Sequence, residues 1–177
     1  MTYEIKHFTL TSRDEAKERT VLLDGFSKYY AMTGWRLGYM IAPVNMAKRL
    51  QDFLVSSISC TASFTQWAGI EALTCNQKFI DEMMFRFKQK RDKIVEGLNS
   101  INGFHCLSPK GAFYAFPNIK KTGMNSEECA EYILNEAGVS CLPGTAFGPS
   151  GEGYLRFSYA NSIENIEKAI ERIKEHF

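Results

Sequence analysis

The sequence lacks the features that identify several large classes of protein. Its 177 residues carry 21 Lys+Arg against 20 Asp+Glu, so a net charge of +1 gives no basic field for a nucleic-acid backbone. No apolar run approaches the roughly 18 residues of a membrane span, and Met1–Lys6 lacks the apolar core of a signal peptide. We therefore expect a cytoplasmic protein that binds neither nucleic acid nor a membrane.

The motifs of several catalytic classes are also absent. There is no HExxH zinc motif, no Walker phosphate loop and no GxSxG nucleophile elbow, so metal-dependent hydrolysis, nucleotide hydrolysis and serine-triad chemistry lack their usual anchors. The cysteines show no CxxC or zinc-type spacing, and we expect no metal site. We expect small buried thiols in a reducing compartment at five positions: Cys60, Cys75, Cys106, Cys129 and Cys141.

The composition is that of a folded chain with a substantial core. Hydrophobic residues make up 45% of the sequence, and a chain of this length buries about 70% of the surface that its unfolded form exposes. The apolar run Thr20–Asp24 predicts a buried strand, and Leu37–Ala42 predicts a strand that is covered on both faces. Three helices are predicted next: one capped by Asn45, one opened by a capping box at Ser63–Gln66, and one over Lys78–Asn99.

The second half of the sequence alternates short strands with helices. Asn125 and Glu128 have the spacing of a capping box, and Gly138 closes the helix that they open. Strands are predicted over Phe104–Leu107, Ala112–Phe116, Val139–Leu142 and Gly153–Tyr159. Alternation along the last strand gives one face to Tyr154, Arg156 and Ser158, and the other to Leu155, Phe157 and Tyr159. One face of a final helix is formed by Ile163, Ile166, Ile170, Ile173 and Phe177.

These patterns predict an α/β region followed by a small α+β domain. We divide the chain into residues 1–77, a connecting helix over residues 78–99, and a small domain over residues 100–177. The charged stretch Lys88–Lys93 interrupts the apolar stripe of the connecting helix, so we expect much of that helix to face solvent.

The residues that point to chemistry follow the first predicted strand. Lys28 lies in the loop after it, and Arg36 lies eight residues later, where the next strand begins. Strand ends in open α/β sheets are common ligand sites. Apolar and aromatic neighbours lower the pKa of a lysine and make its amine nucleophilic toward carbonyls, and an arginine can bind a phosphate through two hydrogen bonds. This pair describes a pyridoxal phosphate site, whereas a solvated lysine is the commoner state of a loop lysine.

Four segments resemble the class I/II pyridoxal phosphate aminotransferases, which have fold type I. Ser27–Tyr39 resembles the lysine signature of this family, closest to its aspartate and aromatic aminotransferase branch. Lys110–Tyr114 resembles the strand that enters the small domain, and Pro143–Gly148 with Gly151–Ser158 resembles the region of the substrate arginine. The resemblance covers essentially the whole chain. It implies an α/β fold in which part of the cofactor-binding large domain precedes an α+β C-terminal small domain.

The resemblance also implies roles for individual residues. Lys28 would bind the cofactor aldehyde covalently and, once released, move a proton between the substrate Cα and the cofactor C4′. Arg36 would bind the cofactor phosphate, and Ser27 is a weaker candidate for the same phosphate. Arg156 would bind the substrate α-carboxylate, although the residues alone favour a structural ion-pair partner. Tyr114 is expected to be a core residue.

The implied reaction moves an amino group between an amino acid and a 2-oxo acid, commonly in a homodimer. Three cofactor contacts of the family would precede the strand at Val21, where this chain has 20 residues. The resemblance therefore implies a C-terminal portion that is catalytically impaired alone. Two alternatives stay open: a non-catalytic fragment or interaction module of the same fold, and another fold type I pyridoxal phosphate reaction, such as that of a β-lyase or a decarboxylase.

Overall fold

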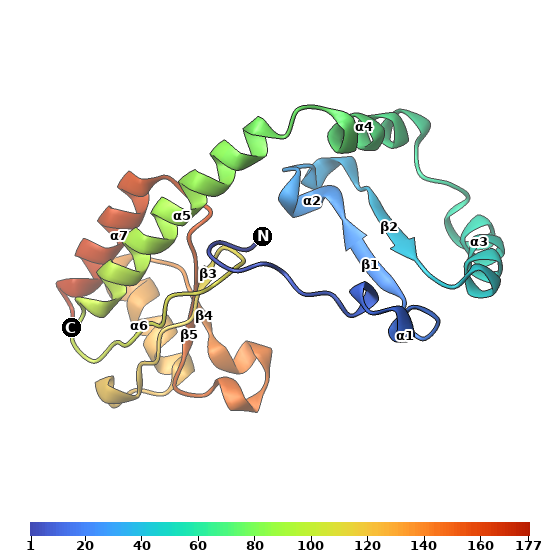
Figure 1. Cartoon of the computed structure of the whole chain (residues 1–177). Coiled ribbons are helices and arrows are strands. Elements are labelled where there is room, and N and C mark those ends of the chain that lie inside the picture. Colours follow the sequence, from blue (N-terminus) through green and yellow to red (C-terminus); the bar gives the residue numbers. More distant parts are fainter. The chain divides into compact units, whose positions relative to one another are not determined.

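The structure is a computed structural model that describes all 177 residues, and the chain divides into two compact units (Figure 1). Unit 1 comprises Met1 with Ile5–Asp81, and unit 2 comprises Thr2–Glu4 with Glu82–Phe177. The three-part division expected from the sequence remains a prediction. None of the helices combines the length and the apolar character that a membrane crossing demands.

Unit 1 is built on a two-stranded antiparallel ribbon. Its strands are β1 (Leu22–Gly25) and β2 (Gly38–Ile41), which pair with Leu22 opposite Ile41. Both strands lie where the sequence predicts them, but neither contains a buried residue, and the Leu23 side chain is 77% exposed. The expectation of a buried strand and of a strand covered on both faces is wrong within this unit, because a ribbon of two strands leaves its faces open unless another layer packs on them.

The helices of unit 1 form as expected, but their first turns do not. The helix predicted to be capped by Asn45 begins at Val44, two residues earlier than that cap implies, and the Pro43 carbonyl accepts a hydrogen bond from the Met46 amide. Ala62 precedes the next helix, so Ser63 is its first helical residue and the predicted capping box does not form. The helical elements are 3₁₀ turns at Leu10–Ser12 (η1) and Thr33–Trp35 (η2), and helices α1 (Asp14–Lys17), α2 (Phe26–Tyr29), α3 (Val44–Ile58) and α4 (Ser63–Thr74).

Unit 2 contains a three-stranded antiparallel sheet with strand order β3-β5-β4. Tyr114 pairs with Ser158, and Leu142 pairs with Arg156, so β5 is the central strand. The predicted strand at Phe104–Leu107 makes only an isolated bridge. The strands are β3 (Tyr114–Ala115), β4 (Leu142–Pro143) and β5 (Leu155–Ser158), and the helices are α5 (Lys78–Asn99), α6 (Ser126–Ala137) and α7 (Ile163–Lys174), with 3₁₀ turns at Lys120–Thr122 (η3), Gly144–Phe147 (η4) and Pro149–Gly151 (η5).

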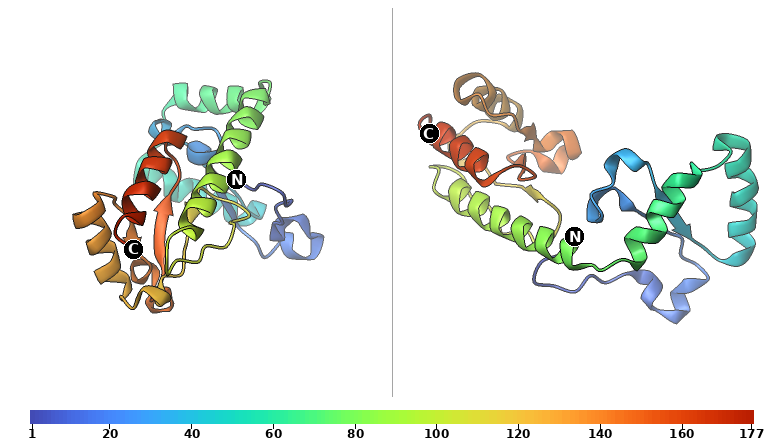
Figure 2. Two further views of the ribbon diagram at one scale, coloured as in Figure 1. Left: turned by 90° about the vertical axis from the view of Figure 1, so that its left-hand side faces the viewer. Right: turned by 90° about the horizontal axis from the view of Figure 1, so that it is seen from above.

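One face of this sheet joins α5, α6 and α7 in a common core. Leu155 and Phe157 are at most 5% exposed, whereas Arg156 between them is only partly buried, which confirms the predicted alternation. Helices α5 and α7 run side by side (Figure 2), and a Cβ added to Gly97 would lie 2.6 Å from Ile170 Cγ1. The other buried side chains of this core include Ile94, Leu98, Ile119, Cys129, Ile133, Tyr159, Ile166 and Ile173.

Both ends of α6 form as the sequence predicts. The Asn125 side chain accepts a hydrogen bond from the Glu128 amide at 2.9 Å, and the Glu128 carboxylate accepts one from the Asn125 amide at 3.1 Å. Gly138 follows the helix in the left-handed conformation, with φ of 64°. The Glu152 carboxylate accepts a hydrogen bond from the Ser126 amide at 2.9 Å, and this bond lowers the pKa of Glu152. The first turn of α6 is therefore held to the loop that leads into β5.

The N-terminal segment Thr2–Glu4 packs into unit 2. The two carboxylate oxygens of Glu4 accept hydrogen bonds from the Arg91 guanidinium, each at 2.7 Å. Arg91 is 5% exposed and lies 4.8 Å from the centre of the Tyr3 ring. The expectation of a solvated charged stretch is wrong at Arg91, because the carboxylates of Glu4 and Asp92 neutralise its guanidinium and permit its burial. We call Thr2–Glu4 with Arg91 the N-terminal clamp.

Candidate active site

Lys28 lies on the short helix α2, directly after β1. The chain turns from β1 into α2 at Gly25, and Phe26, the first residue of α2, is 5% exposed. The centre of the Phe26 ring lies 5.2 Å from that of Tyr30 and 5.8 Å from that of Tyr39. These ring contacts anchor the start of α2. Lys28 follows two residues later and is exposed.

The loop between Lys28 and Arg36 contains two strained backbone positions. Ala31 and Arg36 have φ of 53° and 52°, in the left-handed region that side chains with a Cβ rarely adopt. The Nη1 group of Arg36 donates a hydrogen bond to the Thr33 carbonyl at 2.9 Å, which ties its side chain to the loop. Such a position costs on the order of 1–3 kcal/mol, and positions of this kind cluster at binding sites.

A surface hollow of about 700 Å³ lies beside this loop. Arg36 lines it together with Gly34, Thr61 and Phe64, whereas Lys28 does not line it. A Cβ added to Gly34 would meet nothing within 4 Å, so the loop leaves open space there. The hollow provides room for an anion beside the guanidinium of Arg36.

Arg156 lies on the central strand β5 of unit 2, on the face opposite the core. The carbon at the centre of its guanidinium lies 4.4 Å from the centre of the Tyr114 ring and 4.5 Å from that of Phe147. Tyr114 is only partly buried and contacts this arginine, so the expectation of a core tyrosine is wrong. Sequence reasoning also missed Phe147, because nothing in the spacing of Phe147 and Arg156 indicates a contact.

The structure groups three of the four predicted site residues. Ser27, Lys28 and Arg36 all belong to the connection between β1 and β2 in unit 1, whereas Arg156 belongs to unit 2. A nucleophilic lysine calls for apolar neighbours, whereas a solvated lysine is the commoner state of a loop lysine, and Lys28 is exposed. The activation of its amine by burial therefore stays a prediction. The roles of all four residues likewise stay predictions at this point.

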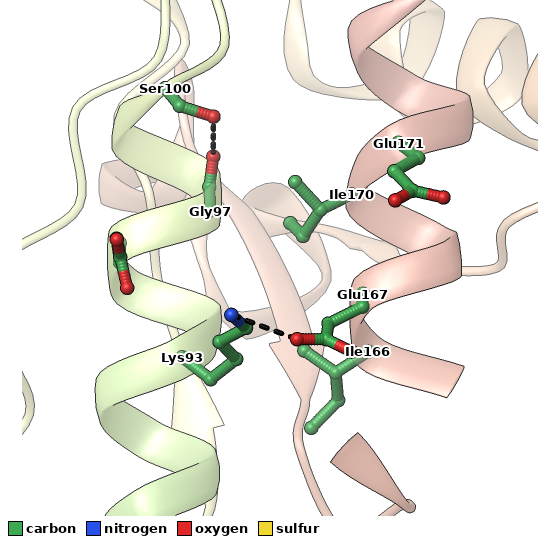
Figure 3. Close-up of a pocket in the computed structure, with 8 residues that line it drawn as sticks. Lys93, Gly97, Ser100, Ile166, Glu167, Ile170 and Glu171 are labelled. Atoms are coloured by element: carbon green, nitrogen blue, oxygen red, sulfur yellow. Dashed lines mark hydrogen bonds and ion pairs between the residues drawn. The ribbon is translucent and has the colours of Figure 1, made fainter. Parts of the chain in front are cut away.

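A second hollow, of about 350 Å³, lies between α5 and α7 (Figure 3). Lys93 bridges it with an ion pair to Glu167 at 2.8 Å, and the hydrogen bond to that carboxylate raises the pKa of Lys93. Gly97 and Ile170 line it where the two helices approach each other. The residues that line this hollow lie there because α5 packs against α7.

The cysteines and acidic residues do not gather into a further site. No group of three His, Cys, Asp or Glu side chains could hold a metal ion, and all five cysteines are free thiols. Burial raises the pKa of Cys106 and of Cys129 to about 11. The expectation of buried thiols is correct for these two cysteines and wrong for Cys60, which is exposed.

The sequence pattern of the family described as aminotransferase class I and II matches residues 2–173 of the chain. The chain belongs to this family. As a class I and II aminotransferase family member, it is 44% identical over 174 residues to the aspartate aminotransferase of Pyrococcus horikoshii, covering 97% of this chain and 44% of that protein. It is 39% identical over 173 residues to the aromatic-amino-acid aminotransferase 2 of Thermococcus litoralis, with coverage of 97% and 44%.

Solved aminotransferase structures share the fold of this family member. The aromatic aminotransferase from Pyrococcus horikoshii superimposes with a TM-score of 0.95 at 40% identity, covering 99% of this chain and 48% of that one. The mixed α/β fold predicted from the sequence is therefore confirmed as part of the fold type I architecture. The chain spans about half the length of the relatives that it matches.

Proposed function

We propose that the chain is the C-terminal portion of a pyridoxal phosphate-dependent aminotransferase that moves an amino group between an amino acid and a 2-oxo acid. The observation that carries this proposal is the β1–β2 connection, which presents Lys28 and Arg36 on one strained loop in a chain of the class I and II aminotransferase family. The names of its relatives support both aspartate and aromatic amino acids as donors.

The donor groups of the β1–β2 connection fit pyridoxal phosphate chemically. The primary amine of Lys28 is exposed and suits an aldehyde, and the guanidinium of Arg36 beside an open hollow suits a phosphate. The chemistry that the cofactor supplies when bound is an electron sink for the bonds at the substrate Cα. Lys28 would hold the cofactor aldehyde in the resting protein and would then move the proton at the substrate Cα. Arg36 would bind the phosphate, and Ser27 is a second candidate for it.

Arg156 binds the α-carboxylate of the substrate in this proposal. Its guanidinium makes no hydrogen bond or ion pair within the protein, so its N–H groups remain available for a bidentate pair with a carboxylate. An arginine serves better than a lysine here, because its planar fork matches the two carboxylate oxygens.

We further propose that the 177 residues turn over poorly by themselves, that the whole enzyme is a homodimer, and that it works in the cytoplasm. The first point rests on coverage, since the chain spans about half the length of its relatives. Its five free thiols fit a reducing compartment.

Covalent labelling tests the role of Lys28 without requiring turnover. The chain is incubated with pyridoxal phosphate and reduced with borohydride, and the modified lysine is identified by mass spectrometry. We expect the pyridoxyl group on Lys28, no labelling of Lys28→Ala at that peptide, and unchanged labelling of Lys110→Ala, a second exposed lysine. Arg36→Gln should raise the concentration of pyridoxal phosphate needed for half-maximal labelling, because the phosphate loses its guanidinium partner.

Labelling spread evenly over the lysines, or labelling that persists in Lys28→Ala, would contradict the proposal. A transamination assay with aspartate or phenylalanine as donor and 2-oxoglutarate as acceptor separates the remaining alternatives. Release of ammonia without an amino acceptor would indicate a lyase. Rapid turnover by the 177 residues alone would overturn the proposal that they are impaired.

A further inference from the structure

The guanidinium of Arg156 lies between two aromatic side chains. The centres of the Tyr114 and Phe147 rings lie 4.4 Å and 4.5 Å from its central carbon. Because β5 is the central strand, the two rings come from its two sides: Tyr114 is on β3, and Phe147 ends the 3₁₀ turn that follows β4. Tyr114 pairs with Ser158, and Ser158 shares a face of β5 with Arg156. The side chains of Tyr114, Ser158 and Arg156 therefore lie on one face of the sheet.

Other rings support the two that contact the guanidinium. The Tyr114 ring centre lies 4.6 Å from that of Phe113, and the Phe147 ring centre lies 6.4 Å from that of Phe116. Phe116 in turn stacks on Tyr154, with centres 5.3 Å apart and planes at 13°. Each ring beside Arg156 therefore contacts a further ring.

A guanidinium held between rings is restricted in a specific way. Its faces are attracted to the electron-rich faces of aromatic rings, and this contact costs none of its N–H donors. All the hydrogen-bond donors of a guanidinium lie in its plane, at its edges. The Arg156 guanidinium makes no hydrogen bond or ion pair within the protein, so its edge is the part left for a ligand.

We propose that Tyr114 and Phe147 are positioning residues, which hold the Arg156 guanidinium between their rings so that its edge meets the carboxylate of the substrate. The inference rests on the proposed role of Arg156. In this proposal the two rings fix the guanidinium, and the guanidinium sets the orientation of the carboxylate. An arginine is more often held in place by acidic partners. Stacking suits a carboxylate-binding arginine, because an acidic partner would occupy the same N–H groups as the substrate.

Nuclear magnetic resonance of the ¹⁵N-labelled chain gives a readout that does not depend on turnover. Ring currents move protons that lie over an aromatic face upfield, so the side-chain Nε–H of Arg156 should resonate upfield of the other arginines. Addition of 2-oxoglutarate should shift this resonance and yield a dissociation constant. The shift of the free protein tests the stacking, and the titration tests the carboxylate contact.

Variants separate positioning from mere packing. Tyr114→Leu and Phe147→Leu should each move the Arg156 Nε–H resonance downfield and raise the dissociation constant of 2-oxoglutarate by about two- to fivefold, the size expected for a lost cation–π contact. Tyr114→Phe keeps the ring, so the Arg156 Nε–H chemical shift and the dissociation constant should both equal those of the unaltered chain. Phe85→Leu removes a 62% exposed ring from α5 and serves as the matched control, with neither value changed.

The two possible failures are distinguishable. If 2-oxoglutarate leaves the Arg156 resonance of the unaltered chain unmoved, the proposed role of Arg156 fails and this inference fails with it. If the oxo acid shifts that resonance but both leucine variants bind it as tightly as the unaltered chain, only the positioning role is overturned. An Arg156 Nε–H resonance within the range of the exposed arginines would also overturn it, whether or not the leucine variants fold.

Discussion

Units 1 and 2 differ in how much apolar surface each one buries within itself. The sheet and three helices of unit 2 enclose a contiguous core. Helix α3, which has 15 residues, buries none of them. The buried hydrophobic side chains of unit 1 are Phe26, Met32 and Ile80, the last on the first turn of α5, which belongs to unit 1. Helical periodicity in the sequence thus produces a core only where a second layer of the same unit packs against the apolar face.

Half of the large apolar side chains that unit 1 exposes belong to α3 and α4. Phe53, Ile58, Phe64 and Trp67 are between 62% and 72% exposed. Exposed apolar side chains in this number are typical of a contact surface. We infer that unit 1 depends for its stability on contacts beyond its own residues, whereas unit 2 supplies its own.

The largest expected effect comes from the core of unit 2. Ile133 on α6 is 1% exposed, so Ile133→Ala should reduce the free energy of unfolding by about 2–5 kcal/mol through lost burial and a residual cavity. Its neighbour Leu134 is 51% exposed, and Leu134→Ala should change that energy by less than about 0.5 kcal/mol. Urea unfolding followed by far-ultraviolet circular dichroism measures both.

Tryptophan fluorescence reports on unit 1 in the same experiment, because Trp35 and Trp67 both belong to it. If Ile133→Ala moves the fluorescence transition as much as the dichroism transition, the two units unfold together. That result would contradict the difference in stability proposed between units 1 and 2. Equal effects of Ile133→Ala and Leu134→Ala would show that the core of unit 2 does not support its stability.

A smaller effect is expected at the helix starts. Asn125 opens α6 with a complete capping box, so Asn125→Ala should cost about 1 kcal/mol. Ser63 has the matching pattern in unit 1 but lies inside α4 and makes no cap, so Ser63→Ala should change stability by less than about 0.5 kcal/mol. Thermal unfolding of the two variants compares them directly, and a larger loss in Ser63→Ala would contradict the assigned start of α4.

The last expected effect is at the N-terminal clamp and depends on pH, and Asp92 still pairs with Arg91 when Glu4 is changed. Hydrogen bonding to Arg91 lowers the pKa of Glu4 from 4.5 to about 2. A carboxyl whose pKa is lower in the folded state stabilises that state above its unfolded pKa, and this contribution is lost as pH falls from about 4.5 toward 2. Glu4→Gln should therefore flatten the acid side of the pH–stability curve.

Urea midpoints of Glu4→Gln and the unaltered chain between pH 7 and pH 2.5 check this expectation. Glu127→Gln on the exposed surface of α6 is the matched control, because Glu127 makes no ion pair with a basic residue. Parallel curves for the unaltered chain and Glu4→Gln would mean that the clamp does not contribute to stability.

Local signals made several features predictable from the sequence. The Asn125 capping box and the closing Gly138 of α6 involve residues three or four positions apart, or a single backbone conformation, so short-range pattern describes them fully. The bounds of α5 and the alternation along β5 follow from periodicity in the same way. The lysine loop was identifiable because its pattern is long and continuous in the chain.

Features that depend on residues far apart in the chain were not predictable. Arg91 lies in a charged stretch for which the sequence predicts solvent exposure. Its burial depends on Glu4, 87 positions earlier. The contact of Tyr114 with Arg156 spans two strands, and that of Phe147 follows from the turn after β4. The predicted caps at Asn45 and Ser63 fail because these residues are the second and the first residue of their helices, and the caps are Pro43 and Ala62.

The sequence by itself determined the local elements, the family pattern around Lys28 and Arg36, and the two faces of β5, because each depends on neighbours in the chain or on a continuous motif. Only the tertiary structure decided which apolar stripes become core, which charge is buried, and which rings enclose Arg156. Those outcomes depend on the pairing of distant segments, where burial and ion pairing are set by the partner that packs against each residue.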